Sequence, residues 1–107
     1  MVNSNIAITN ISIPTEKVKA FCQKNHITKL AFFGSVLRDD FTSTSDLDIL
    51  FEYHPEHIPT YLKIAAWEIE LTDLFNRQVD LRTPAELSKY FRQEVLNEAV
   101  ICYDENR

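Results

Sequence analysis

The spacing of apolar positions changes from segment to segment, and it predicts the secondary structure. After Pro14, the residues Val18, Phe21 and Cys22 recur at helical spacing, so we expect a helix that ends at about Asn25. A short apolar run follows at residues 29–33, is stopped by a glycine, and is typical of a buried strand. The next few residues predict one or two helical turns and then a polar loop.

The second half of the chain repeats this alternation. Residues 47–53 and 79–82 read as two further strands, and the longest helix, residues 60–76, lies between them. The core stripe of that helix is Ile64, Trp67, Leu71 and Leu74. A capping box at residues 83–86, with proline in the first helical position, predicts a last helix that continues to about Asn97. Leu87, Phe91 and Val95 are expected to face inward.

Strands that alternate with helices indicate an α/β (α+β) fold. We expect a small mixed β-sheet of three or more strands, flanked by about four helices. The chain has 107 residues, which matches one domain at residues 15–107, and residues 1–14 read as an extended N-terminal arm. The apolar tail from Val100 to Tyr103 is expected to dock on the body of the domain.

The charge composition limits the classes of partner that the chain is expected to bind. The net charge is -5 and the isoelectric point about 5.1, with no block of Lys or Arg, so direct binding to a nucleic-acid backbone is not expected. An acidic surface suits a basic protein partner instead. The two cysteines, Cys22 and Cys102, are far apart and indicate reduced thiols. With no apolar stretch that could span a membrane, we expect a cytoplasmic protein.

Three aspartates interrupt the predicted strands. Asp46 and Asp48 are two residues apart, so they share a face of their strand, and Asp80 lies between two apolar residues of the next one. Adjacent carboxylates repel each other, and a hard divalent cation relieves that repulsion. We therefore expect the three to bind Mg²⁺, with two ions holding the attacking and leaving oxygens of a phosphoryl transfer. Asp80 is also a candidate acceptor for the proton of an incoming hydroxyl.

Gly34 and Ser35, which ten residues separate from Asp46, would supply the other half of the site. Gly34 is the chain's only glycine, and it lets the backbone turn and approach a phosphate closely. Amides of the following turn and the Ser35 hydroxyl are expected to bind a nucleotide triphosphate, with Arg38 paired to a phosphate oxygen. Alone, Gly-Ser is usually a turn and Asp-x-Asp a solvated strand end. Their combination at this spacing favours a catalytic site.

Residues 32–41 and 45–52, which carry these motifs, resemble the minimal branch of the DNA polymerase beta-like nucleotidyltransferase superfamily. The resemblance implies that Gly34 and Ser35 hold the triphosphate and that Asp46, Asp48 and Asp80 bind Mg²⁺. Members of the MntA type are antitoxins encoded with a HEPN-domain toxin. The resemblance therefore implies a protein adenylyltransferase that moves AMP from ATP to a tyrosine of that toxin and silences it.

Two other functions remain open. The chain could be a non-catalytic antitoxin that acts by complex formation alone, although a complete aspartate trio argues against this. It could also be a small-molecule nucleotidyltransferase, which would need an added acceptor site. A chain of this length leaves little room for a primer, a tRNA or an antibiotic once the core is built. The acceptor is therefore expected on a protein partner that docks over the site in a heteromeric complex.

Overall fold

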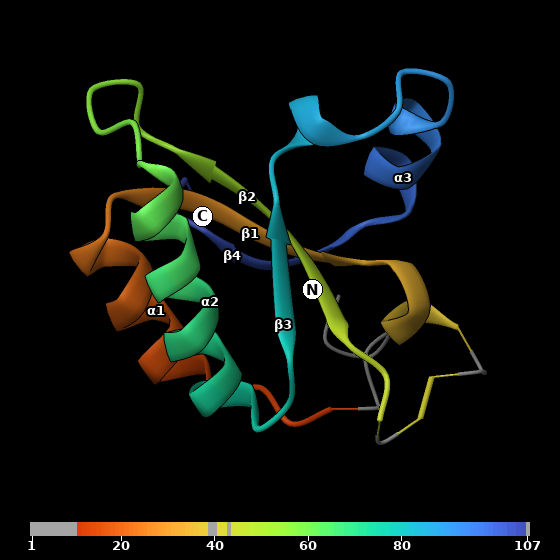
Figure 1. Cartoon of the computed structure of the whole chain (residues 1–107), viewed down its shortest axis with the longest axis horizontal. Coiled ribbons are helices and arrows are strands. Elements are labelled where there is room, and N and C mark those ends of the chain that lie inside the picture. Colours follow the sequence, from red (N-terminus) through yellow and green to blue (C-terminus); the bar gives the residue numbers. More distant parts are fainter. Residues whose placement is uncertain (1–10, 39–40, 43, 107) are drawn as a thin grey trace.

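Four strands form one mixed sheet in the computed structural model, which describes residues 11–38, 41–42 and 44–106 (Figure 1). They are β1 (Ile27–Phe33), β2 (Leu47–Tyr53), β3 (Val79–Arg82) and β4 (Val100–Asp104), in the order β3-β2-β1-β4. β1 is antiparallel to β2 and β4, whereas β2 and β3 are parallel. The predicted mixed sheet is confirmed, and the C-terminal tail docks on it as an edge strand.

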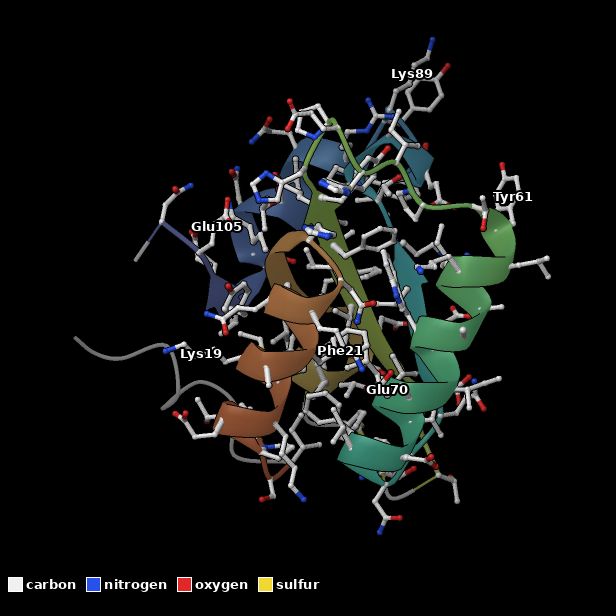
Figure 2. All side chains as sticks on the ribbon, turned by 90° about the vertical axis from the view of Figure 1, so that its left-hand side faces the viewer. Lys19, Phe21, Tyr61, Glu70, Lys89 and Glu105 are labelled. Atoms are coloured by element: carbon white, nitrogen blue, oxygen red, sulfur yellow. The ribbon has the colours of Figure 1, made fainter. Side chains whose placement is uncertain are left out.

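Two helices, α1 (Thr15–Lys24) and α2 (Tyr61–Phe75), lie together over one face of the sheet (Figures 1 and 2). Thr60 caps α2, because its hydroxyl accepts a hydrogen bond of 3.1 Å from the Lys63 amide. Asn76 ends α2 in the left-handed conformation, at φ 60°. The helices predicted at residues 15–25 and 60–76 are therefore confirmed.

The core fills the space between these helices and the sheet. Alternate residues of β2, namely Leu47, Ile49 and Phe51, are buried there. The rings of Phe51 and Phe21 both meet Trp67 edge to face, with centroids 5.8 and 6.3 Å away. Figure 2 shows Phe21 between α1 and α2, whereas Tyr61 projects from the first turn of α2 into solvent.

The outer edge of β3 is covered by side chains of α2. The Val79 amide donates to the Thr72 hydroxyl at 3.1 Å, and the Leu81 amide donates to the Glu68 carboxylate at 2.8 Å. Unpaired edge amides are otherwise free to pair with another chain. These two bonds fasten β3 to α2 and so fix the strand that carries Asp80.

The predicted last helix is wrong in its first half. A 3-10 helix, η3 (Pro84–Glu86), is followed by extended backbone at Leu87, and α3 spans only Arg92–Glu98. A continuous helix would bond the carbonyls of Ala85 and Leu87 to amides four residues on. Here both carbonyls accept instead from the Arg92 guanidinium, at 3.2 and 2.8 Å. Phe91, expected to face inward, is consequently 53% exposed.

A second 3-10 helix, η2 (Gly34–Leu37), follows β1 directly, where one or two helical turns were predicted. Most of the predicted N-terminal arm, residues 1–10, lies outside the described part of the chain, so the division at residue 14 stays a prediction. Among the described helices, none is both long and apolar enough to cross a membrane.

Candidate active site

Two of the predicted metal ligands lie next to each other on neighbouring strands. Asp48 of β2 is aligned with Asp80 of β3, and adjacent strands lie about 4.8 Å apart. Their sequence neighbours point into the core, so both aspartates lie on the face opposite α1 and α2, where they are half-buried. Asp46 precedes β2 by one residue and is exposed. The strand pairing thus places Asp48 and Asp80 side by side on this face, the open face, with Asp46 one residue before the start of β2.

The electrostatics of the site centre on Asp48. Burial raises the pKa of its carboxyl above the ordinary value, and the negative charges of Asp80 and Asp46 raise it further. Arg82 and Arg38 act in the opposite direction and lower the pKa. The charged form of Asp48 is therefore held at a cost, which a bound cation would relieve.

Gly34 lies directly against this carboxylate. Its φ is +76°, a conformation that residues with a side chain rarely adopt. A Cβ atom at this position would stand only 2.6 Å from Oδ2 of Asp48. Two independent requirements, backbone conformation and close approach, thus explain why the chain places its single glycine here.

The other two predicted phosphate ligands frame the same corner. Ser35 is half-buried in η2, and its carbonyl accepts a hydrogen bond of 2.9 Å from the amide of Arg38. Arg38 is exposed at the end of η2, and its charge acts on Asp48. All six predicted site residues, from both halves of the motif, therefore belong to one region of the structure.

Arg77, which the sequence gave no reason to single out, holds the loop that leads to Asp46. Its Nη1 atom donates to the carbonyls of Thr42 and Ser45, both at 3.0 Å. Its guanidinium also lies over the ring of Phe41, 4.4 Å from the centroid. These contacts join residues more than thirty positions apart in sequence, so no local pattern could reveal them.

The backbone after Asp46 is held by Gln78, the residue that follows Arg77 in the turn between α2 and β3. The Leu47 amide donates to the carbonyl of Gln78 at 2.8 Å. The turn between α2 and β3 therefore fastens both sequence neighbours of Asp46, since Arg77 already holds Ser45. Asp46 is exposed and outside any strand, and this double attachment is what positions it.

Arg82 was also missed, although a signal was available. It lies two residues after Asp80 on β3, and residues two apart on a strand share a face. The same spacing argument that joined Asp46 to Asp48 would have placed Arg82 beside the carboxylates.

The donor set fits Mg²⁺ by its chemistry: three carboxylates offer the hard oxygen ligands that this ion prefers. The strained ionisation of Asp48 and the side-chain-free approach at Gly34 both suit a cation with a phosphate beside it. Across residues 11–38, 41–42 and 44–106, no three His, Cys, Asp or Glu side chains already stand as a ready metal cage. Asp46, Asp48 and Asp80 are the residues that would hold the ion.

A family model and sequence relatives match most of this chain. The family described as "Nucleotidyltransferase domain" matches residues 15–102. The chain is 33% identical over 89 residues to the protein adenylyltransferase MntA of Thermococcus cleftensis, an alignment that covers 83% of this chain and 88% of that protein.

Solved structures show the same fold. A toxin–antitoxin crystal structure with AMP-PNP superposes on 86% of this chain and 74% of that chain, with a TM-score of 0.68 and 17% identity. The toxin–antitoxin MntA-HepT superposes on 84% of this chain and 69% of that chain, with a TM-score of 0.60 and 16% identity. At these identities the likeness establishes the architecture alone.

Proposed function

The chain belongs to the nucleotidyltransferase domain family, and we propose that it is an antitoxin that transfers AMP from ATP to a tyrosine hydroxyl of a HEPN-domain toxin. The observation that carries this proposal is the contact of Gly34 with Asp48, beside its aligned neighbour Asp80. That contact joins the phosphate-binding half of the motif to the carboxylate half. The names of its relatives, a protein adenylyltransferase and toxin–antitoxin complexes, supply the acceptor class.

Asp46, Asp48 and Asp80 would hold two Mg²⁺ ions, which neutralise negative charge on the triphosphate. Gly34 lets the backbone approach the phosphates, and the Ser35 hydroxyl donates to a phosphate oxygen. Arg38, exposed at the end of η2, pairs with a further phosphate oxygen. These residues orient the α-phosphorus toward the open face of the sheet, where an acceptor can approach.

The transfer needs a deprotonated acceptor. The tyrosine oxygen forms a bond to the α-phosphorus, the bond from that phosphorus to the β-bridging oxygen breaks, and pyrophosphate leaves. Tyrosine has an ordinary pKa of about 10, so its proton must be removed. Asp80 is half-buried on β3 beside Asp48, and we assign it the role of accepting that proton.

A protein partner suits the size and charge of the chain. With a net charge of -5, the surface complements a basic protein rather than a nucleic acid. The buried faces of α1 and α2 pack into the core, and the aspartates lie on the opposite face of the sheet. The acceptor hydroxyl would therefore arrive on the toxin, which docks over the open face.

Intact mass measurement tests the proposal. The chain is purified with the protein encoded beside it, incubated with ATP and Mg²⁺, and both masses are recorded. We expect the partner to gain whole AMP units, and the Asp46→Asn/Asp48→Asn variant to leave its mass unchanged. Asp73→Asn, an exposed aspartate on α2, is the matched control and should retain full transfer.

Two results would contradict the proposal. Unchanged masses beside a stable inhibitory complex would favour an antitoxin that acts by binding alone. Transfer of AMP to a small molecule, with the partner unmodified, would favour a small-molecule nucleotidyltransferase.

A further inference from the structure

Residues of η2 and α3 line a cleft of about 990 Å³. Figure 1 shows α3 on the side of the sheet away from α1 and α2. Gly34, Leu37 and Arg38 line one wall, and Phe91, Glu94 and Glu98 line the other. We propose that this cleft binds the nucleoside of ATP, with the base stacked on Phe91 and the ribose hydroxyls bonded to the two glutamates. This inference rests on the function proposed above and adds the residues that would read the nucleoside.

The cleft is continuous with the proposed triphosphate site. Gly34 and Arg38 belong to both, and Gly34 touches the Asp48 carboxylate. A nucleotide whose phosphates lie at Gly34 must extend its nucleoside into an adjoining space. The volume of this cleft is at the upper end of the range typical of small-molecule sites, which is more than a triphosphate alone requires.

Charge sets the direction in which the nucleotide lies. The wall formed by η2 ends in the positive Arg38, whereas the α3 wall carries two negative side chains, Glu94 and Glu98. Phosphates are attracted to the first wall and repelled by the second. The neutral nucleoside is the part of ATP that can lie against α3, so the charges orient the ligand with its phosphates toward the aspartates.

The α3 wall also has the chemistry that a nucleoside needs. Phe91 is 53% exposed where it borders the cleft, and Phe33, Val95 and Val100 add apolar lining. Bases stack well on an aromatic ring presented in this way. Phe91 is exposed because Arg92 binds the carbonyls of Ala85 and Leu87 and so interrupts the predicted helix. The interruption leaves the aromatic ring of Phe91 in the lining of the cleft.

The two glutamates suit the ribose. Glu94 and Glu98 are four residues apart on α3, so their side chains lie on one face of the helix. Ionised carboxylates only accept hydrogen bonds, and the ribose offers two hydroxyl donors. The pair can therefore accept from the 2′- and 3′-hydroxyls and distinguish a ribonucleotide from an analogue that lacks them.

Binding assays with two ligands test the stacking contact. Calorimetry would measure Mg·ATP and Mg·tripolyphosphate on the whole chain and on Phe91→Ala. We expect the variant to bind ATP about tenfold more weakly, while its affinity for tripolyphosphate stays within about twofold of the wild type. The control is Tyr90→Ala, which removes a neighbouring aromatic ring that is 86% exposed and does not line the cleft. It should change neither affinity.

A second comparison tests the glutamates. The wild type should bind ATP several-fold more tightly than 2′,3′-dideoxy-ATP, and Glu94→Ala/Glu98→Ala should bring the two affinities together. Glu16→Ala, an exposed glutamate on α1, is the matched control and should preserve the difference. Equal affinities of the wild type for the two nucleotides would overturn the assignment of the glutamates.

The outcomes separate this inference from the proposed function. If the wild type binds neither ATP nor tripolyphosphate in Mg²⁺, the proposed function fails and the nucleoside site fails with it. If ATP binds but Phe91→Ala leaves its affinity unchanged, only the nucleoside site is overturned. A rise in KM for the partner protein in Phe91→Ala, at unchanged ATP affinity, would also overturn it and assign the cleft to the acceptor.

Discussion

The two faces of β2 and β3 are built from alternate residues of the same strands, yet one face forms the core and the other carries the aspartates of the candidate site. The face under α1 and α2 carries Leu47, Ile49 and Phe51 of β2, all of them buried. The other face carries Asp48 and Asp80, half-buried and mutually repelling. A shift of one residue in strand register would exchange the two sets completely. Period-two alternation is therefore what separates stability from chemistry in this small domain.

The difference is also energetic. Apolar burial and edge-to-face aromatic contacts on the covered face favour folding. On the open face, the raised pKa of Asp48 means that ionising it works against the folded state. If this contrast holds, substitutions on the first face should mainly lower stability. Those on the second should mainly lower activity, and some of them should raise stability.

The largest expected effect is on the covered face. Phe51 is 1% exposed and packs against Trp67, so Phe51→Ala should lower the free energy of unfolding by about 3–5 kcal/mol. Urea denaturation would measure the loss. Ile69→Ala, which removes an apolar side chain that is 68% exposed on α2, should stay within about 0.5 kcal/mol of the wild type. Similar losses for the two variants would contradict the contrast.

The next substitution, Gly34→Ala, should affect both stability and activity. Gly34→Ala forces a side chain into a positive φ, at a cost of roughly 1–2 kcal/mol in stability, and displaces the Asp48 carboxylate. We expect AMP transfer to be lost while the domain remains folded, as measured by intact mass and thermal unfolding.

Asn76→Ala separates the two causes in Gly34→Ala. Asn76 also has a positive φ, 60°, but it lies at the end of α2. It should lose about 1 kcal/mol and keep full activity. If Gly34→Ala retains transfer, close approach to Asp48 does not matter for the reaction.

The contrast between the faces also explains what the sequence could predict. Apolar alternation within one segment located β2 and β3, and helical spacing located α2, because in each case burial of one face decides the structure. The two-residue period of a strand also grouped Asp46 with Asp48. Strand pairing then aligned Asp48 with Asp80, which no spacing within a single segment could show.

The features that were missed depend on contacts between distant or irregular segments. The last helix was predicted as continuous, since nothing in its pattern shows that Arg92 takes the carbonyls of Ala85 and Leu87. The tail was expected to dock, but its pairing with β1 as an edge strand needs the whole sheet. Arg77 reaches a loop more than thirty residues earlier, so its role emerges only once the chain is folded.

Arg77 tests the comparison indirectly. It holds the loop before Asp46, but it is not itself a predicted ligand of Mg²⁺. Arg77→Gln removes two hydrogen bonds from a charged donor to the loop before Asp46. We expect a loss of about 1 kcal/mol in stability and a larger loss in divalent-ion affinity. Titration with Mn²⁺, followed by its paramagnetic resonance signal, would measure that affinity.

If the role of Arg77 is purely structural, Arg77→Gln should show the same loss in stability but no change in divalent-ion affinity. Arg92→Gln is the matched control, since Arg92 also donates to two backbone carbonyls but in the segment after β3. It should destabilise the fold similarly and leave Mn²⁺ affinity unchanged. Arg77→Lys, which keeps one donor and the charge, should recover part of the affinity.

The smallest expected effect runs against the usual direction of mutation. Burial and two neighbouring carboxylates raise the folded-state pKa of Asp48, so above the ordinary value of 3.8 the unfolded chain gives up this proton more readily than the folded one. Stability therefore falls as pH rises from that value through the raised pKa. Asp48→Asn cannot ionise, and it should raise Tm by a few degrees at pH 7 without Mg²⁺ while abolishing AMP transfer.

This gain should shrink as the pH is lowered toward 3.8 and vanish below it, because only there is the wild-type carboxyl protonated in both the folded and the unfolded state. Thermal unfolding between pH 4 and pH 8 would follow it, with Asp73→Asn as the control because that aspartate is exposed on α2. A lower Tm for Asp48→Asn at pH 7 would mean that Asp48 stabilises the fold. The open face would then contribute to folding as well as to chemistry, and the division between the two faces would fail at its central residue.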